Sequence, residues 1–295
     1  MSGLGVLAIF YLAASVGSPK TVDKPAWSKV FEANDRGSWL TAVWAKNETE
    51  WFAGGKGFIV RSQNRNIEKT AFPGKVILGL GPKDAASPFA VGSDQFVARL
   101  DGTKWVQEHE GRTSIQDRSR GQYSDDLLAA GYLEEGATVP LVAFGPYAIL
   151  TRRSNGTWGA PAESDRSRLR DLALLGPKAS APADCAGPGW LWLGRKVGWI
   201  TCHDRRAFLV DGGKIEPLGR LPTGCRFHIS TSVLSRGSLY VSCGTAGLFR
   251  STAGGWQPVP APKGVRSIAV TERCMFLATM RAVWRKCDGG DVPAT

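Results

Sequence analysis

The sequence predicts an all-β fold, a β-propeller built from four-stranded blades. The first observation is a repeat: three segments, 51–54, 89–92 and 143–145, align without a gap, and each is followed seven residues later by an arginine. Thirteen residues after each glycine comes an apolar or aromatic side chain, Ile67, Trp105 or Trp158. The second observation is composition, since 11 Trp and 36 Gly against 3 Met are typical of short strands joined by tight turns. Self-similarity at a fixed period indicates stacked supersecondary units.

The first three repeat units can be assigned strand by strand, because apolar runs of four to six residues alternate with polar positions as they do in half-buried strands. The predicted strands are 39–44, 51–53, 58–61 and one near Ile67; then 76–80, 89–91, 96–99 and 105–106; then 127–132, 141–144, 149–152 and one at Trp158. The polar segments 112–126 and 164–170 are expected to be surface loops.

The second half of the chain continues the repeat with three more units. The fourth has strands at 190–193, 199–202 and 208–210 and one at Ile215, with 172–175 as an alternative first strand. The fifth runs from Cys243 to Trp256 at the same spacing, and the sixth comprises 265–270, 275–278 and 283–285 but lacks a closing strand. The isolated strand 27–31 supplies the missing strand, which would close the ring and protect its edges. Six blades are favoured, with seven as the alternative if region 112–190 contains another.

The N-terminal segment predicts export. Residues 4–14 are apolar but too few to span a bilayer, and small residues follow at 13–17, as at a signal peptidase site. No Lys or Arg precedes Lys20, so a short uncleaved anchor is the alternative. The expected organisation is a signal or anchor at 1–17, a linker at 18–26, one propeller domain at 27–287 and a tail at 288–295. The expected location is the periplasm, the outer surface or the extracellular space, and no further transmembrane span is expected.

The charge favours an acidic partner. The net charge is +11 and the isoelectric point is about 9.6, which suits polyanionic surroundings such as anionic glycans, lipopolysaccharide, lipid headgroups or nucleic acid. Nucleic acid is not expected as a partner, because no recognition motif is present and export would separate the two. We expect a monomer.

The six cysteines predict three local disulfides. Cys185 and Cys202 are 17 residues apart, Cys225 and Cys243 are 18 apart, and Cys274 and Cys287 are 13 apart. In the repeat register each pair lies at neighbouring strand ends, so the expected bonds are Cys185–Cys202, Cys225–Cys243 and Cys274–Cys287. Zinc binding by Cys202, His203, Cys225 and His228, and a thiol nucleophile at Cys202, are the alternatives. We expect no metal, no cofactor and no catalytic residue.

The repeat resembles two known families. Segments 54–61, 96–105 and 149–158 resemble the degenerate Asp-box repeat of the bacterial neuraminidase-like propellers, with the best copy of the motif at 101–105. They also resemble the photosystem II assembly and stability factor. The first resemblance implies a glycan-cleaving site, but the Arg-Ile-Pro signature ahead of the first Asp-box is absent. The second implies a non-enzymatic role in which one face binds a protein or peptide.

The arginines of the repeat are the candidate binding residues. Arg61, Arg99, Arg152 and Arg250 recur at one register, so propeller symmetry would place them in a ring at similar height. Guanidinium groups suit carboxylate or phosphate partners. The alternative is that each arginine pairs within its blade or with the next one.

The leading functional hypothesis is an exported, non-catalytic propeller that binds a protein, a peptide or an anionic macromolecule, as in an assembly scaffold. The alternatives are a sialidase-like hydrolase or lyase on the same fold, and a surface module that binds anionic glycans.

Overall fold

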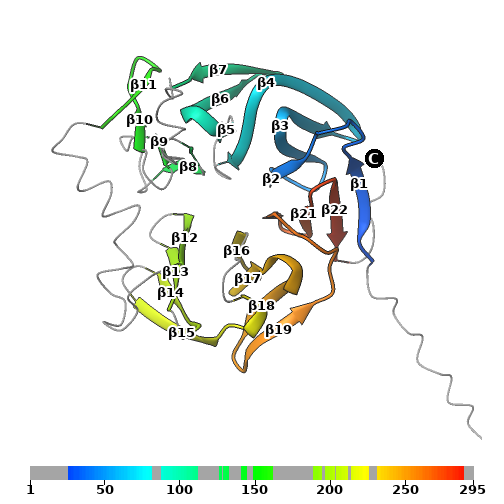
Figure 1. Ribbon diagram of the computed structural model, residues 1–295, viewed down its shortest axis with the longest axis vertical. Helices are drawn as coiled ribbons and strands as arrows, with labels where there is room; N and C mark the ends of the chain where they lie inside the picture. Colours follow the sequence, from blue (N-terminus) through cyan, green and yellow to red (C-terminus); the bar gives the residue numbers. More distant parts are fainter. Residues whose placement is uncertain are drawn as a thin grey trace, which may run out of the picture.

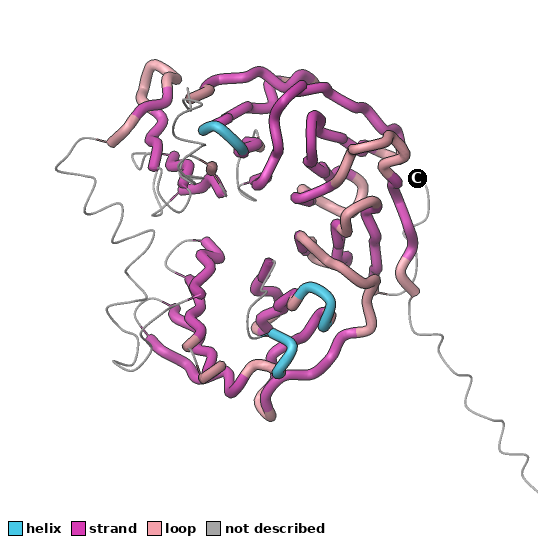
Figure 2. The backbone as a smooth tube through the Cα atoms, in the orientation of Figure 1, coloured by secondary structure: helices cyan, strands magenta, loops and turns pink. Residues whose placement is uncertain are grey.

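The computed structural model of the protein describes residues 26–81, 88–111, 126–127, 129–132, 141–144, 149–161, 189–194, 197–202, 204–211, 214–225 and 231–288. These residues form β-sheets arranged around a common centre, with each sheet directed outward from it (Figure 1). The helical residues in this part of the chain are three short 3-10 turns: η1 (Ser93–Gln95), η4 (Thr223–Cys225) and η5 (Gly244–Ala246) (Figure 2). The all-β propeller prediction is therefore confirmed.

The described strands make four four-stranded sheets and one six-stranded sheet. Within each four-stranded sheet the strands are given in the order in which they pair. Two of these sheets are β1 (Ser28–Glu32), β22 (Ala282–Cys287), β21 (Cys274–Ala278), β20 (Ser267–Val270), and β11 (Trp158–Gly159), β10 (Ile149–Arg152), β9 (Leu141–Phe144), β8 (Ala129–Tyr132). The other two are β12 (Gly189–Gly194), β13 (Val197–Thr201), β14 (Arg206–Asp211), β15 (Lys214–Arg220), and β16 (Thr231–Ser235), β17 (Ser238–Ser242), β18 (Leu248–Thr252), β19 (Gly255–Val259). The six-stranded sheet contains β2 (Leu40–Ala45), β3 (Glu50–Gln63), β4 (Asn66–Gly81), β5 (Phe89–Gly92), β6 (Phe96–Asp101) and β7 (Lys104–His109). The fourth repeat unit therefore begins at β12, and its alternative start at 172–175 lies outside the described residues.

The six-stranded sheet corrects the prediction of six separate four-stranded blades. Its strand β4 pairs with β3 through its first half and with β5 through its second half, so the sheet is not interrupted between the first two repeat units. Gly74 lies within β4 at a φ of 78°, where glycine lets the strand turn without ending. Strand β3 itself folds back, since the Asn64 amide donates to the Thr49 carbonyl at 3.1 Å. Region 112–190, where the alternative places a seventh blade, lies largely outside the described residues.

The two ends of the chain meet in one sheet. Strand β1 pairs antiparallel with β22, in a register that places Ser28 opposite Arg285 and Glu32 opposite Ala282. Figure 1 shows β1 outside β22 at the edge of the molecule. The Trp27 indole donates to the Pro260 carbonyl at 2.7 Å, which fixes the start of the strand. The expected pairing of the N-terminal strand with the last hairpin is therefore observed.

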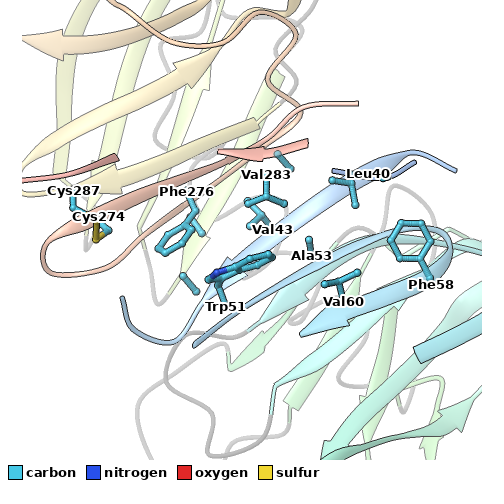
Figure 3. Packing of buried hydrophobic residues seen from close by; sticks show 14 residues of the cluster. Leu40, Val43, Trp51, Ala53, Phe58, Val60, Cys274, Phe276, Val283 and Cys287 are labelled. Atoms are coloured by element: carbon cyan, nitrogen blue, oxygen red, sulfur yellow. A yellow bond between two sulfur atoms is a disulfide. The ribbon is translucent and has the colours of Figure 1, made fainter. Parts of the chain in front are cut away.

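The core consists of apolar layers between neighbouring sheets. Figure 3 shows the layer between the first and last sheets, where Trp51 of β3 faces Phe276 of β21 with ring centroids 6.3 Å apart. Phe276 is fully buried, and Phe31 of β1 packs beside Trp51. Burying an aromatic side chain of this size contributes roughly 2–3 kcal/mol. The seam between residues that are far apart in sequence is thus as apolar as an ordinary domain core.

The glycine of the repeat lies at the end of the second strand of a unit. There it contacts the backbone at the start of the first strand of the same unit. A Cβ on Gly92 would lie 2.0 Å from the Val76 carbonyl oxygen, and one on Gly55 would lie 1.9 Å from that of Trp39. Glycine is required there because any side chain would collide with backbone. In the first unit the glycine against the backbone is Gly55, whereas a Cβ on Gly54, the glycine of the sequence alignment, would lie 2.5 Å from the Ile77 side chain.

Cysteine replaces this glycine in a later unit. Cys243, which follows β17, is bonded to Cys225, which precedes β16, with Cα atoms 4.7 Å apart. The second predicted bond, Cys274–Cys287, joins residues directly opposite each other on β21 and β22. Cys202 is also disulfide-bonded, and its predicted partner Cys185 lies outside the described residues.

Candidate functional site

The candidate site is the central cavity of the propeller, which has a volume of about 1420 Å³. Its described walls come from the innermost strands β2, β16 and β20, from the second half of β4, and from the turns beside them. Small-molecule sites usually enclose about 300–1,000 Å³. The cavity is therefore large enough for several residues of an extended peptide.

The free edges of the innermost strands give the cavity wall its hydrogen-bonding capacity. Strands β2, β16 and β20 each stand at the end of their sheet, so no other strand of the described residues pairs with one edge of each. Backbone N–H and C=O groups on such an edge can pair with an added chain. Part of the β2 edge is already occupied, because the Ser267 hydroxyl accepts from the Val43 amide at 3.0 Å and lies 3.4 Å from the Val43 carbonyl.

The side chains of the described wall are mainly aliphatic or hydroxyl-bearing. Leu78, Leu80 and Val233 lie beside Thr231 and Ser232. The charged residues of the described wall lie near the ends of strands or in turns: Arg266 precedes β20, and Arg236 and Glu272 follow β16 and β20. The repeat pattern gave no signal for these charges, because they occupy turns that differ from unit to unit.

The predicted binding arginines lie elsewhere. Arg61 of β3 is buried and donates through Nε and Nη2 to Glu50 Oε1, at 3.1 and 2.7 Å. Arg250 of β18 is half-buried and contacts Gln257 Oε1 at 3.5 Å. None of the four arginines is among the described residues that line the cavity. Their role in binding stays a prediction.

Arg99 and Arg152 meet on one glutamate. Glu108 of β7 accepts from Arg99 Nε at 2.7 Å, from Arg152 at 2.9 and 3.0 Å, and from the Trp158 indole at 2.9 Å. Burial opposes ionisation of Glu108, but the hydrogen bonds from Arg152, Trp158 and Arg99 outweigh it and hold its pKa below the ordinary value. Because Arg152 and Trp158 belong to the next sheet, Glu108 fastens two sheets together.

Acid should weaken the fold in two steps. Burial lowers the pKa of His109 below its ordinary 6.5, against a weaker opposing effect of the Glu110 charge. A lowered folded-state pKa means that the unfolded chain binds protons more readily, so this contribution to stability is present above pH 6.5 and is lost as the pH falls through the folded value. The pKa values of Glu48, Glu108 and Glu110 lie below their ordinary 4.5, so their contributions are lost in the same way below pH 4.5.

Urea unfolding at a series of pH values measures this dependence. The free energy of unfolding is expected to be flat above pH 7, to decline below 6.5 and to decline further below 4.5. His109→Gln is expected to remove the first decline and leave the second. A first decline that persists in His109→Gln would contradict this assignment.

Two further features concern the part of the chain that the structure describes. No group of three or more His, Cys, Asp or Glu side chains there could hold a metal ion. No helix within it is long and apolar enough to cross a membrane.

Comparison with known proteins identifies the fold. No family model matches the sequence, and no curated protein matches it. A protein of unknown function from Bacteroides thetaiotaomicron has a similar structure, with a TM-score of 0.54 at 11% identity over 88% of this chain and 75% of that one. YCF48 bound to D1 peptide is also similar, with a TM-score of 0.54 at 10% identity over 92% of this chain and 99% of that one. The chain is a β-propeller.

A third propeller neighbour is the extracellular domain described as part of a hybrid two-component system of B. thetaiotaomicron. Its TM-score is 0.53 at 9% identity, over 92% of this chain and 43% of that one. At these identities the likeness concerns the fold alone, and function has to be argued from the site.

Proposed function

We propose that this propeller is an exported, non-catalytic protein that binds an extended segment of another protein in its central cavity. The observation that carries the proposal is the large cavity bounded by free strand edges. Main-chain hydrogen bonds along such an edge supply affinity for any extended peptide, while neighbouring side chains select its sequence. Binding of this kind suits an assembly scaffold, as the resemblance to the photosystem II assembly and stability factor implies.

The similarity to YCF48 bound to D1 peptide supports a peptide partner, because in that structure a protein of similar fold binds a peptide. The cavity wall supports the same partner through its mixture of aliphatic side chains and hydroxyls. A polyanion would instead favour a wall of cationic side chains.

The disulfides support export. Cys225–Cys243 and Cys274–Cys287 are both formed, and disulfides persist in oxidising compartments such as the periplasm and the extracellular space. Extracellular location of the third neighbour agrees with this, and the segment 1–17 is proposed to be the export signal or anchor.

We also infer that the propeller is a closed ring. The pairing of β1 with β22 supports closure by the N-terminal strand.

Selection of peptides from a displayed random library, followed by affinity measurement with the purified chain, tests the proposed function. Thr231 lies in the cavity wall on β16, and Thr103 lies in an exposed turn between β6 and β7. Thr231→Trp is expected to weaken binding of the selected peptides by about tenfold or more, because the ring fills space that the peptide needs. Thr103→Trp, the matched control, is expected to leave the affinity unchanged. Equal affinities for the two variants would overturn the cavity as the binding site.

A further inference from the structure

Three loops meet on the face of the propeller where β2 begins. They are residues 33–40, the turn at Lys56 and the turn at Met280, and backbone hydrogen bonds hold them together. The Leu40 amide donates to the Met280 carbonyl at 2.9 Å, the Lys56 amide to the Trp39 carbonyl at 2.9 Å, and the Ala33 amide to the Arg281 carbonyl at 2.7 Å. These loops therefore present their side chains from a fixed backbone.

An apolar surface is exposed at this junction. Met280 is 47% exposed, the highest fraction among the large hydrophobic residues that are exposed in the described part of the chain. Trp39, half-buried beside it in the loop 33–40, has the Lys56 ammonium 4.6 Å from its ring centroid. Met, Trp and Arg side chains are enriched where proteins bind partners, and Met adds adaptable packing to its apolar area.

The charges around this surface are predominantly positive. Arg36, Lys56 and Arg281 are exposed, and no carboxylate of the described residues forms an ion pair with any of them. Arg281 Nη1 donates to the carbonyls of Ala33 and Asp35, which are neutral acceptors. The Asp35 carboxylate is itself engaged by Lys69.

This surface continues to the central cavity. Arg266 is exposed, lines the cavity, and donates its amide to the Ala278 carbonyl just before the Met280 turn. On the other side, Thr41 lines the cavity two residues after Trp39. We call Arg36, Trp39, Lys56, Arg266 and Met280 the Met280 patch.

We propose that the Met280 patch binds an acidic segment of a partner protein that carries an apolar side chain. The apolar side chain packs on Met280 and Trp39, and flanking carboxylates approach Arg36, Lys56 and Arg266. Because the patch has an apolar centre surrounded by cationic side chains, it favours such a peptide over a glycan or a nucleic acid. Those polyanions have no apolar side chain to pack on Met280. The proposal rests on the proposed function, because it describes where a partner that enters the cavity first contacts the protein.

Fluorescence anisotropy with three labelled peptides tests the patch. The first is rich in glutamate with one central leucine, the second has glutamine in place of every glutamate, and the third has serine in place of the leucine. The full chain is expected to bind the first peptide about tenfold more tightly than either of the others, and less tightly as NaCl rises from about 0.05 to about 0.3 M. Equal affinity for the first and third peptides would overturn the proposal in favour of a polyanion surface.

Charge-reversal variants of the protein provide a second test of the patch. The double variant Lys56→Glu, Arg266→Glu is expected to weaken binding of the first peptide about tenfold or more, and Met280→Ser several-fold. The control Lys104→Glu, Lys214→Glu changes the net charge equally on the exposed outer strands β7 and β15 and is expected to change affinity less than twofold.

The two proposals can fail separately. If both double variants lose the same affinity for the first peptide, the proposal of the Met280 patch is wrong, but the proposal of binding in the cavity is not affected. If library peptides lose affinity for Thr231→Trp but not for the patch variants, the cavity stands and the patch is wrong.

Discussion

Replacing Glu108 with alanine is expected to lower the free energy of unfolding by about 3 kcal/mol. The carboxylate is 10% exposed and accepts hydrogen bonds from Arg99, Arg152 and Trp158. Its removal takes away the carboxylate that the two guanidinium groups share, leaving Arg99 with the exposed Asp101 at 3.7 Å, and leaves the indole N–H without its acceptor. Losing one partner of a buried pair typically costs about 3–5 kcal/mol, and we take the low end because the arginines are 27% and 30% exposed.

Urea unfolding of Glu108→Ala and of the control Glu110→Ala measures the free energy of unfolding that each variant loses. Glu110 is also ion-paired, to Lys75, but its side chain is 44% exposed, so its loss is expected to cost less than about 1 kcal/mol. If both variants lose the same stability, Glu108 does not fasten the two sheets. Glu108→Gln is expected to fall between the wild type and the alanine variant, since it keeps an acceptor without the charge.

Replacing Phe276 with alanine is expected to cost about 3–5 kcal/mol. Phe276 is fully buried in the layer between the last and first sheets and packs against Trp51. The cost combines the lost burial with the cavity left in a layer whose backbone is held on both sides. Because this layer lies between the first and last sheets, the measurement also reports on how firmly these sheets are held together.

Phe249 of β18 provides the matched control, since it has the same side chain but is only half-buried. Phe249→Ala is expected to cost about half as much as Phe276→Ala or less. A cost for Phe276→Ala no greater than that for Phe249→Ala would mean that the first and last sheets are not packed together in solution.

The sequence was informative wherever the structure repeats. The positions of β5, β6 and β20 to β22, the pairing of β1 with β22 and the bonds Cys225–Cys243 and Cys274–Cys287 follow from periodicity and strand-end geometry. The continuity of β4 was missed because Pro73-Gly74 reads as a turn, whereas pairing on both halves keeps the strand intact.

Side-chain partners between sheets were not readable in the same way. Arg152 and its acceptor Glu108 are 44 residues apart, and nothing local marks either as half of a pair. The arginine register was visible, but whether each arginine meets a glutamate depends on the twist between sheets. The Met280 patch was missed for a related reason, since its loops come from opposite ends of the chain and meet only when β1 and β22 pair.

Photo-crosslinking of a selected peptide, followed by mass spectrometric mapping, tests the central claim that this propeller binds an extended segment at its centre. The expected crosslinks fall on the cavity strands β2, β16 and β20, with further crosslinks on loops 33–40 and 264–266. Crosslinks confined to the outer strands β7, β15 and β19 would contradict it.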